Sequence, residues 1–206
     1  MEQVLTCCPS RIRPERLSIM IDSFHRTKKG DTRLVVYVDE ADPRIEEYKK
    51  LNHQQYIEYG PFRFQAGVVN YFSTEKYPGR EFYQEIHDDH VFITDGWDVE
   101  MMRTINDHGC WGVCGANDTI NLYFADPARN PGAAMISGNI IQTLGYWFLP
   151  CLRAFRIDEA FRELLNPFGL IHHRQDIVID HVCWHDGRRG FGARAPLDET
   201  SKWQYL

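Results

Sequence analysis

Short apolar runs alternate with stretches of helical spacing along most of the chain. The apolar runs are bounded by turn residues and predict strands at residues 3–8, 33–40, 54–59, 82–89, 110–116 and 176–184. Between the first two runs, Pro14 suits a first helical turn, and Leu17, Met20, Ile21 and Phe24 then recur at helical spacing until Gly30 breaks the pattern. Similar patterns predict helices at residues 43–51, 64–76, 96–109, 137–145 and 158–169, with 117–136 rich in loops.

This order of elements predicts an α/β fold. Strands that alternate with helices form a mostly parallel sheet with helices on both faces. Each helix returns the chain to the end of the sheet where the previous strand began, so the next strand runs in the same direction. With 206 residues and no interdomain linker, we expect residues 1–206 to form a single Rossmann-like domain.

Polar residues stand at the carboxyl ends of four predicted strands. They are Cys8 with the Pro-Ser-Arg that follows it, Asp39, the pair Asp88–Asp89, and Asn117–Asp118. Ligands of such sheets bind beyond the carboxyl ends of the strands. The four ends together therefore predict a binding site along this edge.

Composition narrows the classes of partner. The net charge is −6 and the basic residues form no run, so nucleic-acid binding is not expected. No apolar run approaches 18 residues and the first residues contain no secretory apolar region, so we expect no membrane span and a cytoplasmic protein, in a host cytoplasm if a phage or virus encodes it. The six cysteines form no CxxC pair and are expected to be free thiols.

The motif QEIHDDHVFITDGWD, residues 84–98, places two adjacent acids between two histidines. Burying adjacent carboxylates is costly unless an arginine or a divalent cation faces them, although a solvated turn is the alternative. Apolar residues flank the motif, which favours a position at the edge of the core. If it continues a strand, Asp88 and Asp89 point to opposite faces and do not chelate one cation in the same way.

His181 is a second candidate ligand. Ile177, Ile179, His181, Cys183 and His185 share one face of a strand, on which His181 and His185 lie about 13 Å apart. One cation therefore takes His181, with His185 secondary. A carboxylate and an imidazole with open positions suit Mn²⁺ or Mg²⁺ carrying phosphate oxygens.

Taken in order, these motifs resemble those of small bacterial and phage glycosyltransferases of the GT-A fold, which use nucleotide sugars. The segment TCCPSRIRPERL is similar to the family's opening strand and helix, VVYVDEADPRIEEY to its second strand, and IHDDHVFITDGWD to its acidic metal motif. The stretch from Gly115 to Trp147 resembles the acceptor side, and DIVIDHVCWHDGRRG the closing strand with its metal histidine. Cys183 departs from the family, whose members often carry a histidine there.

The resemblance implies a role for each motif residue. Asp89 and His181 would bind the metal. Asp158 would be the catalytic base, with Glu159 as the alternate base. The competing interpretation of Asp158 is that it is the N-cap of a helix. Nucleotide contacts are expected from Cys8, Arg11, Arg13, Asp39, Asn70, Asp88 and Arg188. Acceptor contacts are expected from Asp118, Ser137 and Trp147, although a core position is the favoured interpretation of Trp147. Residues 1–116 would be the nucleotide-binding half, 117–186 the acceptor and catalytic half, and 187–206 a mobile tail.

The implied activity is metal-dependent transfer of a sugar, from a UDP- or GDP-sugar by preference, to a glycan or other hydroxyl acceptor, with inversion at the sugar carbon. Two alternatives use the same residues. A metal-dependent nucleotidyltransferase or phosphohydrolase would use the same acids and cation, with water or a phosphate as the other reactant. A non-catalytic domain would only bind the nucleotide or a partner protein. The loop CCPSRIRP lacks the glycines typical of nucleotidyltransferases of similar fold.

Overall fold

The computed structural model describes residues 3–119, 131–153 and 156–182 and contains one eight-stranded sheet. The strands are β1 (Val4–Ser10), β2 (Thr32–Asp39), β3 (Ile57–Gly60), β4 (Phe82–Glu85), β5 (His90–Phe92), β6 (Val113–Asn117), β7 (Gly132–Ser137) and β8 (Ile171–His181). Their order across the sheet is β3-β2-β1-β4-β7-β6-β8-β5. β1 to β4 are mutually parallel, as are β6 and β8, whereas β7 and β5 run antiparallel to their neighbours.

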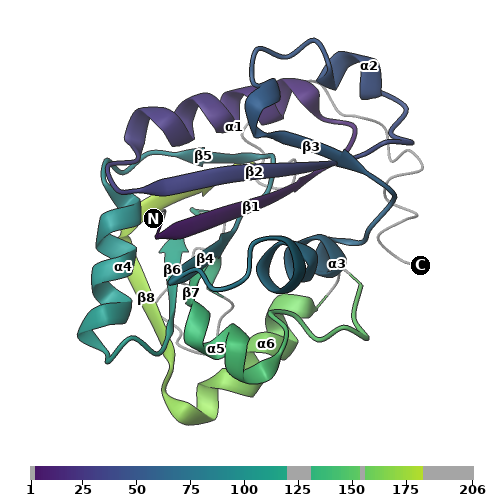
Figure 1. Cartoon of the computed structure of the whole chain (residues 1–206). Coiled ribbons are helices and arrows are strands. Elements are labelled where there is room, and N and C mark those ends of the chain that lie inside the picture. The colour runs from purple at the N-terminus through teal and green to yellow at the C-terminus, as the bar shows by residue number, and fades with distance from the viewer. Residues whose placement is uncertain (1–2, 120–130, 154–155, 183–206) are drawn as a thin grey trace.

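Helices cover both faces of the sheet, which gives three layers (Figure 1). On one face, α1 (Pro14–Thr27) and α4 (Trp97–Asp107) bury Leu17, Phe24 and Trp97 in one core. On the other face, α3 (Gln65–Asn70), α5 (Gly138–Leu144) and α6 (Ile157–Leu165) enclose a second core around Trp147 and Phe161. Short helices complete the chain: α2 (Ile45–Tyr48), η1 (Gln54–Tyr56), η2 (Tyr71–Lys76) and η3 (Asn166–Phe168).

The mostly parallel α/β sheet predicted from the sequence is confirmed, with differences at strand boundaries. β4 ends at Glu85, so the two acids lie outside it, and residues 54–56 form a 3-10 turn instead of the start of β3. Two strands were not predicted. β7 lies in the stretch expected to be loop, and the three residues of β5 are too few to show alternation.

A buried acid fixes the amino edge of the sheet. Asp98, in the first turn of α4, is fully buried, and its carboxylate accepts hydrogen bonds from Lys29 N (3.0 Å), Gly30 N (2.9 Å) and Thr32 Oγ1 (2.8 Å). It therefore joins the start of α4 to the turn that leads into β2. Within the described residues, no helix has the length and apolar character needed to cross a membrane.

Candidate functional site

The acidic motif forms a tight turn at the carboxyl edge of the sheet. His90 N donates a hydrogen bond to His87 O (3.2 Å), so Asp88 and Asp89 are the two central residues of a four-residue turn between β4 and β5. Antiparallel pairing of β5 with β8 then sets His90 opposite His181. The end of the last described strand is thereby brought to the acids.

Asp89 and His181 meet across this edge. Asp89 Oδ1 lies 3.1 Å from His181 Nε2, without the alignment of a hydrogen bond, and this buried oxygen has no hydrogen-bond partner. Its other oxygen, Oδ2, accepts a hydrogen bond from Arg13 Nη1 at 2.8 Å and lies 3.6 Å from Arg16 Nη1. The two side chains expected to converge on a cation are in contact, and their role as its ligands stays a prediction.

Asp88 is held by the opening strand and helix. Its carboxylate accepts hydrogen bonds from Ser10 Oγ (2.8 Å) and from Arg13 Nη1 (3.1 Å). Tyr48 supports both partners, because its hydroxyl lies 2.8 Å from Ser10 Oγ and accepts a hydrogen bond from Arg13 N at 2.9 Å. The expectation that the acids point to opposite faces of a strand is therefore wrong: they lie in a turn and contact the same guanidinium nitrogen.

The ionisation of the site follows from these contacts. Burial alone would raise the pKa of Asp89, but His181 and Arg13 hold that pKa well below its ordinary value. Burial, together with the charge of Asp89, raises the pKa of Asp88, although Arg13 opposes the shift. The pair therefore contains one firmly ionised carboxylate and one that binds a proton more readily.

The two histidines beside the acids, His87 and His90, also differ in their pKa values. Burial lowers the pKa of His87, but the Glu85 carboxylate 2.9 Å away outweighs it and raises the pKa to about 9. Burial and the neighbouring histidines lower the pKa of His90 well below its ordinary value. His87 is therefore the cationic member of a pair with Glu85, and His90 is a neutral imidazole.

The residues fit a divalent cation. Oδ1 of Asp89 is a buried anionic oxygen without a hydrogen bond, and it faces an imidazole nitrogen that can be a second ligand. A small pocket adjoins the acids and is lined by Arg16, Ile19, Asp88, Asp89, His90, Val91 and Val182. An oxygen and nitrogen donor set of this kind suits Mn²⁺.

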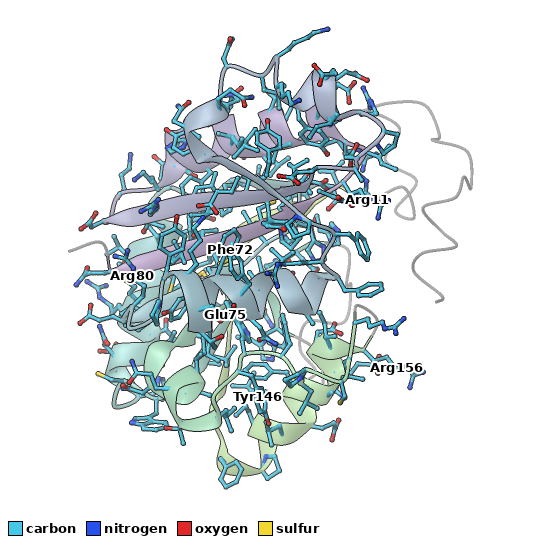
Figure 2. The ribbon with its side chains drawn as sticks, turned by 45° about the vertical axis from the view of Figure 1, so that its right-hand side comes forward. Arg11, Phe72, Glu75, Arg80, Tyr146 and Arg156 are labelled. Atoms are coloured by element: carbon cyan, nitrogen blue, oxygen red, sulfur yellow. The ribbon has the colours of Figure 1, made fainter. Side chains whose placement is uncertain are left out.

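Other predicted site residues lie along the same edge. Asp39 ends β2 and accepts a hydrogen bond from Ala41 N (2.9 Å), and the Arg11 guanidinium lies 5.2 Å from the centre of the Phe62 ring. The Asp118 carbonyl accepts a hydrogen bond from His181 N (3.0 Å). Arg156, which precedes α6, lies on the same side of the molecule as Arg11 and away from Arg80 (Figure 2).

Asp158 is the predicted catalytic base. It is exposed in the first turn of α6, whose N-cap is Arg156, so the interpretation of Asp158 as the N-cap is wrong. The chain before α6 is joined to α3 by the hydrogen bond from Ala66 N to Arg153 O (3.1 Å). Its catalytic role stays a prediction.

Three other predicted residues have structural surroundings instead. The thiol of Cys8 is fully buried in the core beneath α1, and burial raises its pKa. Asn70 donates to Phe148 O and accepts from Trp147 N and Phe148 N, which fixes that backbone to α3. Trp147 is 1% exposed and packs on Tyr83 and Phe148, so its ring has no free face for a sugar.

Ser137 lies at the opposite edge of the sheet from the acids. It pairs with Phe82, the first residue of β4, whereas the acids follow the last residue of β4. Its hydroxyl caps α5 and donates to Cys110 O (2.6 Å), which corrects its assignment to the acceptor site. Arg188, Cys183, His185 and the tail 187–206 lie outside the described residues.

Several side chains of the site were given no role of their own from the sequence. Ser10, Tyr48, Glu85, His87 and His90 complete the surroundings of the acids. The two histidines flank the acids in the motif, and Asp-Asp is common in turns, so a turn at residues 87–90 would have placed both histidines together. Tyr48 gives no comparable signal, because its position depends on how α2 packs.

Comparisons with known proteins agree with this geometry at the level of the fold. No protein-family model matches the chain, and no curated protein matches it in sequence. Among solved structures, the mannosyltransferase PcManGT of Pyrobaculum calidifontis, in complex with GDP-Man and Mn²⁺, is 12% identical with a TM-score of 0.67, covering 92% of this chain and 58% of that one. TarS of S. aureus in complex with UDP-GlcNAc is 10% identical with a TM-score of 0.57, covering 86% of this chain and 57% of that one.

A mycobacterial protein is 11% identical with a TM-score of 0.61, over 88% of this chain and 68% of that one. The chain thus spans somewhat less than three-fifths of PcManGT and of the TarS structure. At these identities the likeness concerns the fold, and on that evidence the chain has the α/β fold of the GT-A glycosyltransferases.

Proposed function

We propose that this protein is a metal-dependent glycosyltransferase that moves a sugar from a nucleotide diphosphate sugar to a hydroxyl acceptor. The observation that carries the proposal is the contact between Asp89 and His181, 92 positions apart in the chain, at the carboxyl edge of a GT-A sheet. UDP- and GDP-sugars are the favoured donors, because the similar structures contain UDP-GlcNAc and GDP-Man.

Asp89 and His181 would hold Mn²⁺ or Mg²⁺. The cation, when bound, supplies positive charge that stabilises the departing diphosphate. His181 and Arg13 keep Asp89 ionised, and the guanidinium groups of Arg13 and Arg16 both lie on its Oδ2 side while Oδ1 has no hydrogen bond. Asp88 fixes Arg13 from the other side, and Asp39 is assigned to the ribose or base.

The acceptor is activated by a carboxylate in this proposal. Asp158 takes the proton of the acceptor hydroxyl while the hydroxyl oxygen forms a bond to the sugar carbon. On the opposite face of that carbon, the bond to the diphosphate oxygen breaks. The exposed first turn of α6 keeps this carboxylate accessible to an acceptor. A general base of this kind contributes about 10²- to 10⁴-fold to the rate.

A screen of sugar nucleotides tests the proposal. The protein is mixed with UDP-, GDP-, CDP- and dTDP-sugars, with and without Mn²⁺, and its melting temperature is measured, since a ligand that binds only the folded state raises it. We expect one or two donors to raise the melting temperature only when Mn²⁺ is present. Failure of every donor in both conditions would contradict the proposal.

A pair of variants separates binding from chemistry. Asp158→Asn should bind the identified donor with wild-type affinity and lose about 100-fold or more in turnover, whereas the matched Glu159→Gln should keep its turnover. The reverse result would move the base to Glu159. Wild-type turnover in both variants would remove a carboxylate base on α6 from the mechanism.

A further inference from the structure

Three histidines converge next to the acids. His87 and His90 are the first and last residues of the turn, and His181 lies beside them at the end of β8. Each histidine offers a nitrogen atom, and these atoms all lie within 4.8 Å of one another. Within the part of the chain that the structure describes, no other three histidine, cysteine or acidic side chains come together in this way. Asp89 lies outside the cluster, and His181 is the histidine of the three whose contact with it is described.

We propose that His87, His90 and His181 form a site for a borderline divalent cation of the Zn²⁺ class. Three imidazoles with a position left for water or another ligand are a donor set that Zn²⁺ accepts, and imidazole suits Zn²⁺, Ni²⁺ and Cu²⁺ better than Mg²⁺. This site differs from the Asp89–His181 pair in its ligands, since two nitrogens replace the carboxylate.

The surroundings of His87 support a ligand role. Its Nε2 lies 2.9 Å from Glu85 Oε1, and Gln65 Nε2 donates to the same carboxylate at 2.7 Å. Glu85 faces a proton on Nε2, and binding of a cation through Nδ1 requires the His87 ring to release its second proton. Histidine ligands generally donate their other N–H to a carboxylate in this manner, which fixes the ring and strengthens its binding.

His90 is also fixed within reach of the cluster. The ring is 4% exposed, stacks on His87 with centroids 5.2 Å apart, and meets the edge of His181 at 4.6 Å. Its Nδ1 accepts a hydrogen bond from His87 N (3.0 Å), so binding through Nε2 requires the other tautomer and gives up that one bond. A metal–nitrogen bond formed in its place outweighs one hydrogen bond.

The shared residue has a consequence for activity. A cation held by three imidazoles engages His181, which is then withdrawn from Asp89. Stoichiometric Zn²⁺ is therefore expected to inhibit transfer supported by Mn²⁺; this consequence rests on the proposed function, whereas the binding of Zn²⁺ does not.

Metal titration of the purified, metal-stripped full chain tests the site. Calorimetry with ZnCl₂ should give one strong site per chain, MgCl₂ should give none at the same concentrations, and Co²⁺ should develop the visible absorption typical of nitrogen ligands. His87→Ala and His90→Ala should each weaken Zn²⁺ binding by about tenfold or more. His172→Ala, which alters the separate stacked pair with His108, should bind Zn²⁺ as the wild type does.

His90 is buried, so His90→Gln is measured beside His90→Ala, and circular dichroism establishes that each variant is folded. No strong Zn²⁺ site in the wild type, or wild-type affinity in both His87→Ala and a folded His90 variant, would overturn the proposal. A strong Zn²⁺ site without any response to sugar nucleotides and Mn²⁺ would leave this site in place and contradict the proposed function instead. Mn²⁺-dependent transfer without Zn²⁺ binding would do the opposite.

Discussion

Two aspartates of the same sequence motif are buried at opposite edges of the sheet, and their partners differ in kind. Asp98 accepts hydrogen bonds from two backbone N–H groups and one hydroxyl, all neutral donors fixed by the fold. Asp89 is held by the guanidinium groups of Arg13 and Arg16 and by the imidazole of His181, and its Oδ1 has no hydrogen bond. Burial alone therefore does not separate a structural acid from a candidate ligand, whereas the identity of the partners does.

The largest expected effect is the loss of activity in Asp89→Ala. If Asp89 is a metal ligand of a transferase, its removal should reduce turnover by about 1,000-fold or more, equivalent to about 4 kcal/mol in the barrier. The folded state should persist, because the charged partners of Asp89 can turn to water. Turnover is measured with the donor identified by the screen, and the melting temperature is recorded with it.

Asp95→Ala is the control for Asp89→Ala. Asp95 lies in the same motif, its side chain is 70% exposed, and its contact is a surface pair with Lys29 at 3.7 Å. It should keep wild-type turnover. If Asp89→Ala kept it as well, the contrast between the two buried aspartates would have no functional meaning.

The next effect is on stability and falls on Asp98. Asp98→Ala leaves two backbone N–H groups and a hydroxyl without their acceptor in a buried site, which should lower the free energy of unfolding by about 3–4 kcal/mol. Denaturant titration measures this, and Asp95→Ala should stay within about 0.5 kcal/mol of the wild type. A loss below about 1 kcal/mol for Asp98→Ala would mean that water replaces the carboxylate and that Asp98 is not structural in the sense argued above.

Arg13 gives a smaller effect that depends on the metal. Its side chain is 39% exposed and contacts both acids, so Arg13→Ala should cost about 1–2 kcal/mol of stability, less than a fully buried ion pair would. Without the guanidinium, the adjacent carboxylates repel each other, and Mn²⁺ should then stabilise the variant more than it stabilises the wild type. The measurement is the rise in melting temperature with MnCl₂ for both proteins.

An equal rise in the two proteins would show that Arg13 and the cation do not act on the same carboxylates. Lys29→Ala provides the matched control, because it removes a positive charge from the surface pair with Asp95. Its response to MnCl₂ should equal that of the wild type.

The sequence predicted the layered fold and the edge that carries the site, for physical reasons that are local. Apolar runs and helical spacing are properties of neighbouring residues, and β1, α1, β2 and α4 all lie close to their predicted positions. The pairing of Asp89 with His181 was expected from the resemblance to the GT-A glycosyltransferases, in which the acidic motif and the closing strand supply the metal ligands. The missed strand β7 and the partners Ser10 and Tyr48 depend on packing between distant segments, which a local pattern does not contain.

Errors in the site have the same origin. Ser137, Asn70 and Trp147 are a cap, an amide that fixes a backbone and a core indole. Residue type alone makes each of them suitable for binding a nucleotide or an acceptor, and only the three-dimensional neighbours distinguish a binding role from a structural one. The prediction that Asp88 and Asp89 point to opposite faces was wrong for a different reason. It applied the alternation of a strand to residues beyond the end of β4, where the chain forms the turn at residues 87–90.

Ser137→Ala should have the smallest effect on turnover and tests that distinction directly. The variant loses the hydroxyl that accepts from Asn139 N at the start of α5 and donates to Cys110 O, so the free energy of unfolding should fall by about 1–2 kcal/mol. Turnover and donor affinity at a temperature where the variant is folded should equal those of the wild type, because Ser137 pairs with the first residue of β4 and the acids follow its last. A fall in the apparent affinity for the acceptor, with stability unchanged, would return Ser137 to the acceptor site. Loss of stability with intact turnover would mean that Ser137, at the amino end of β4, stabilises the fold, whereas the binding site lies at the carboxyl end.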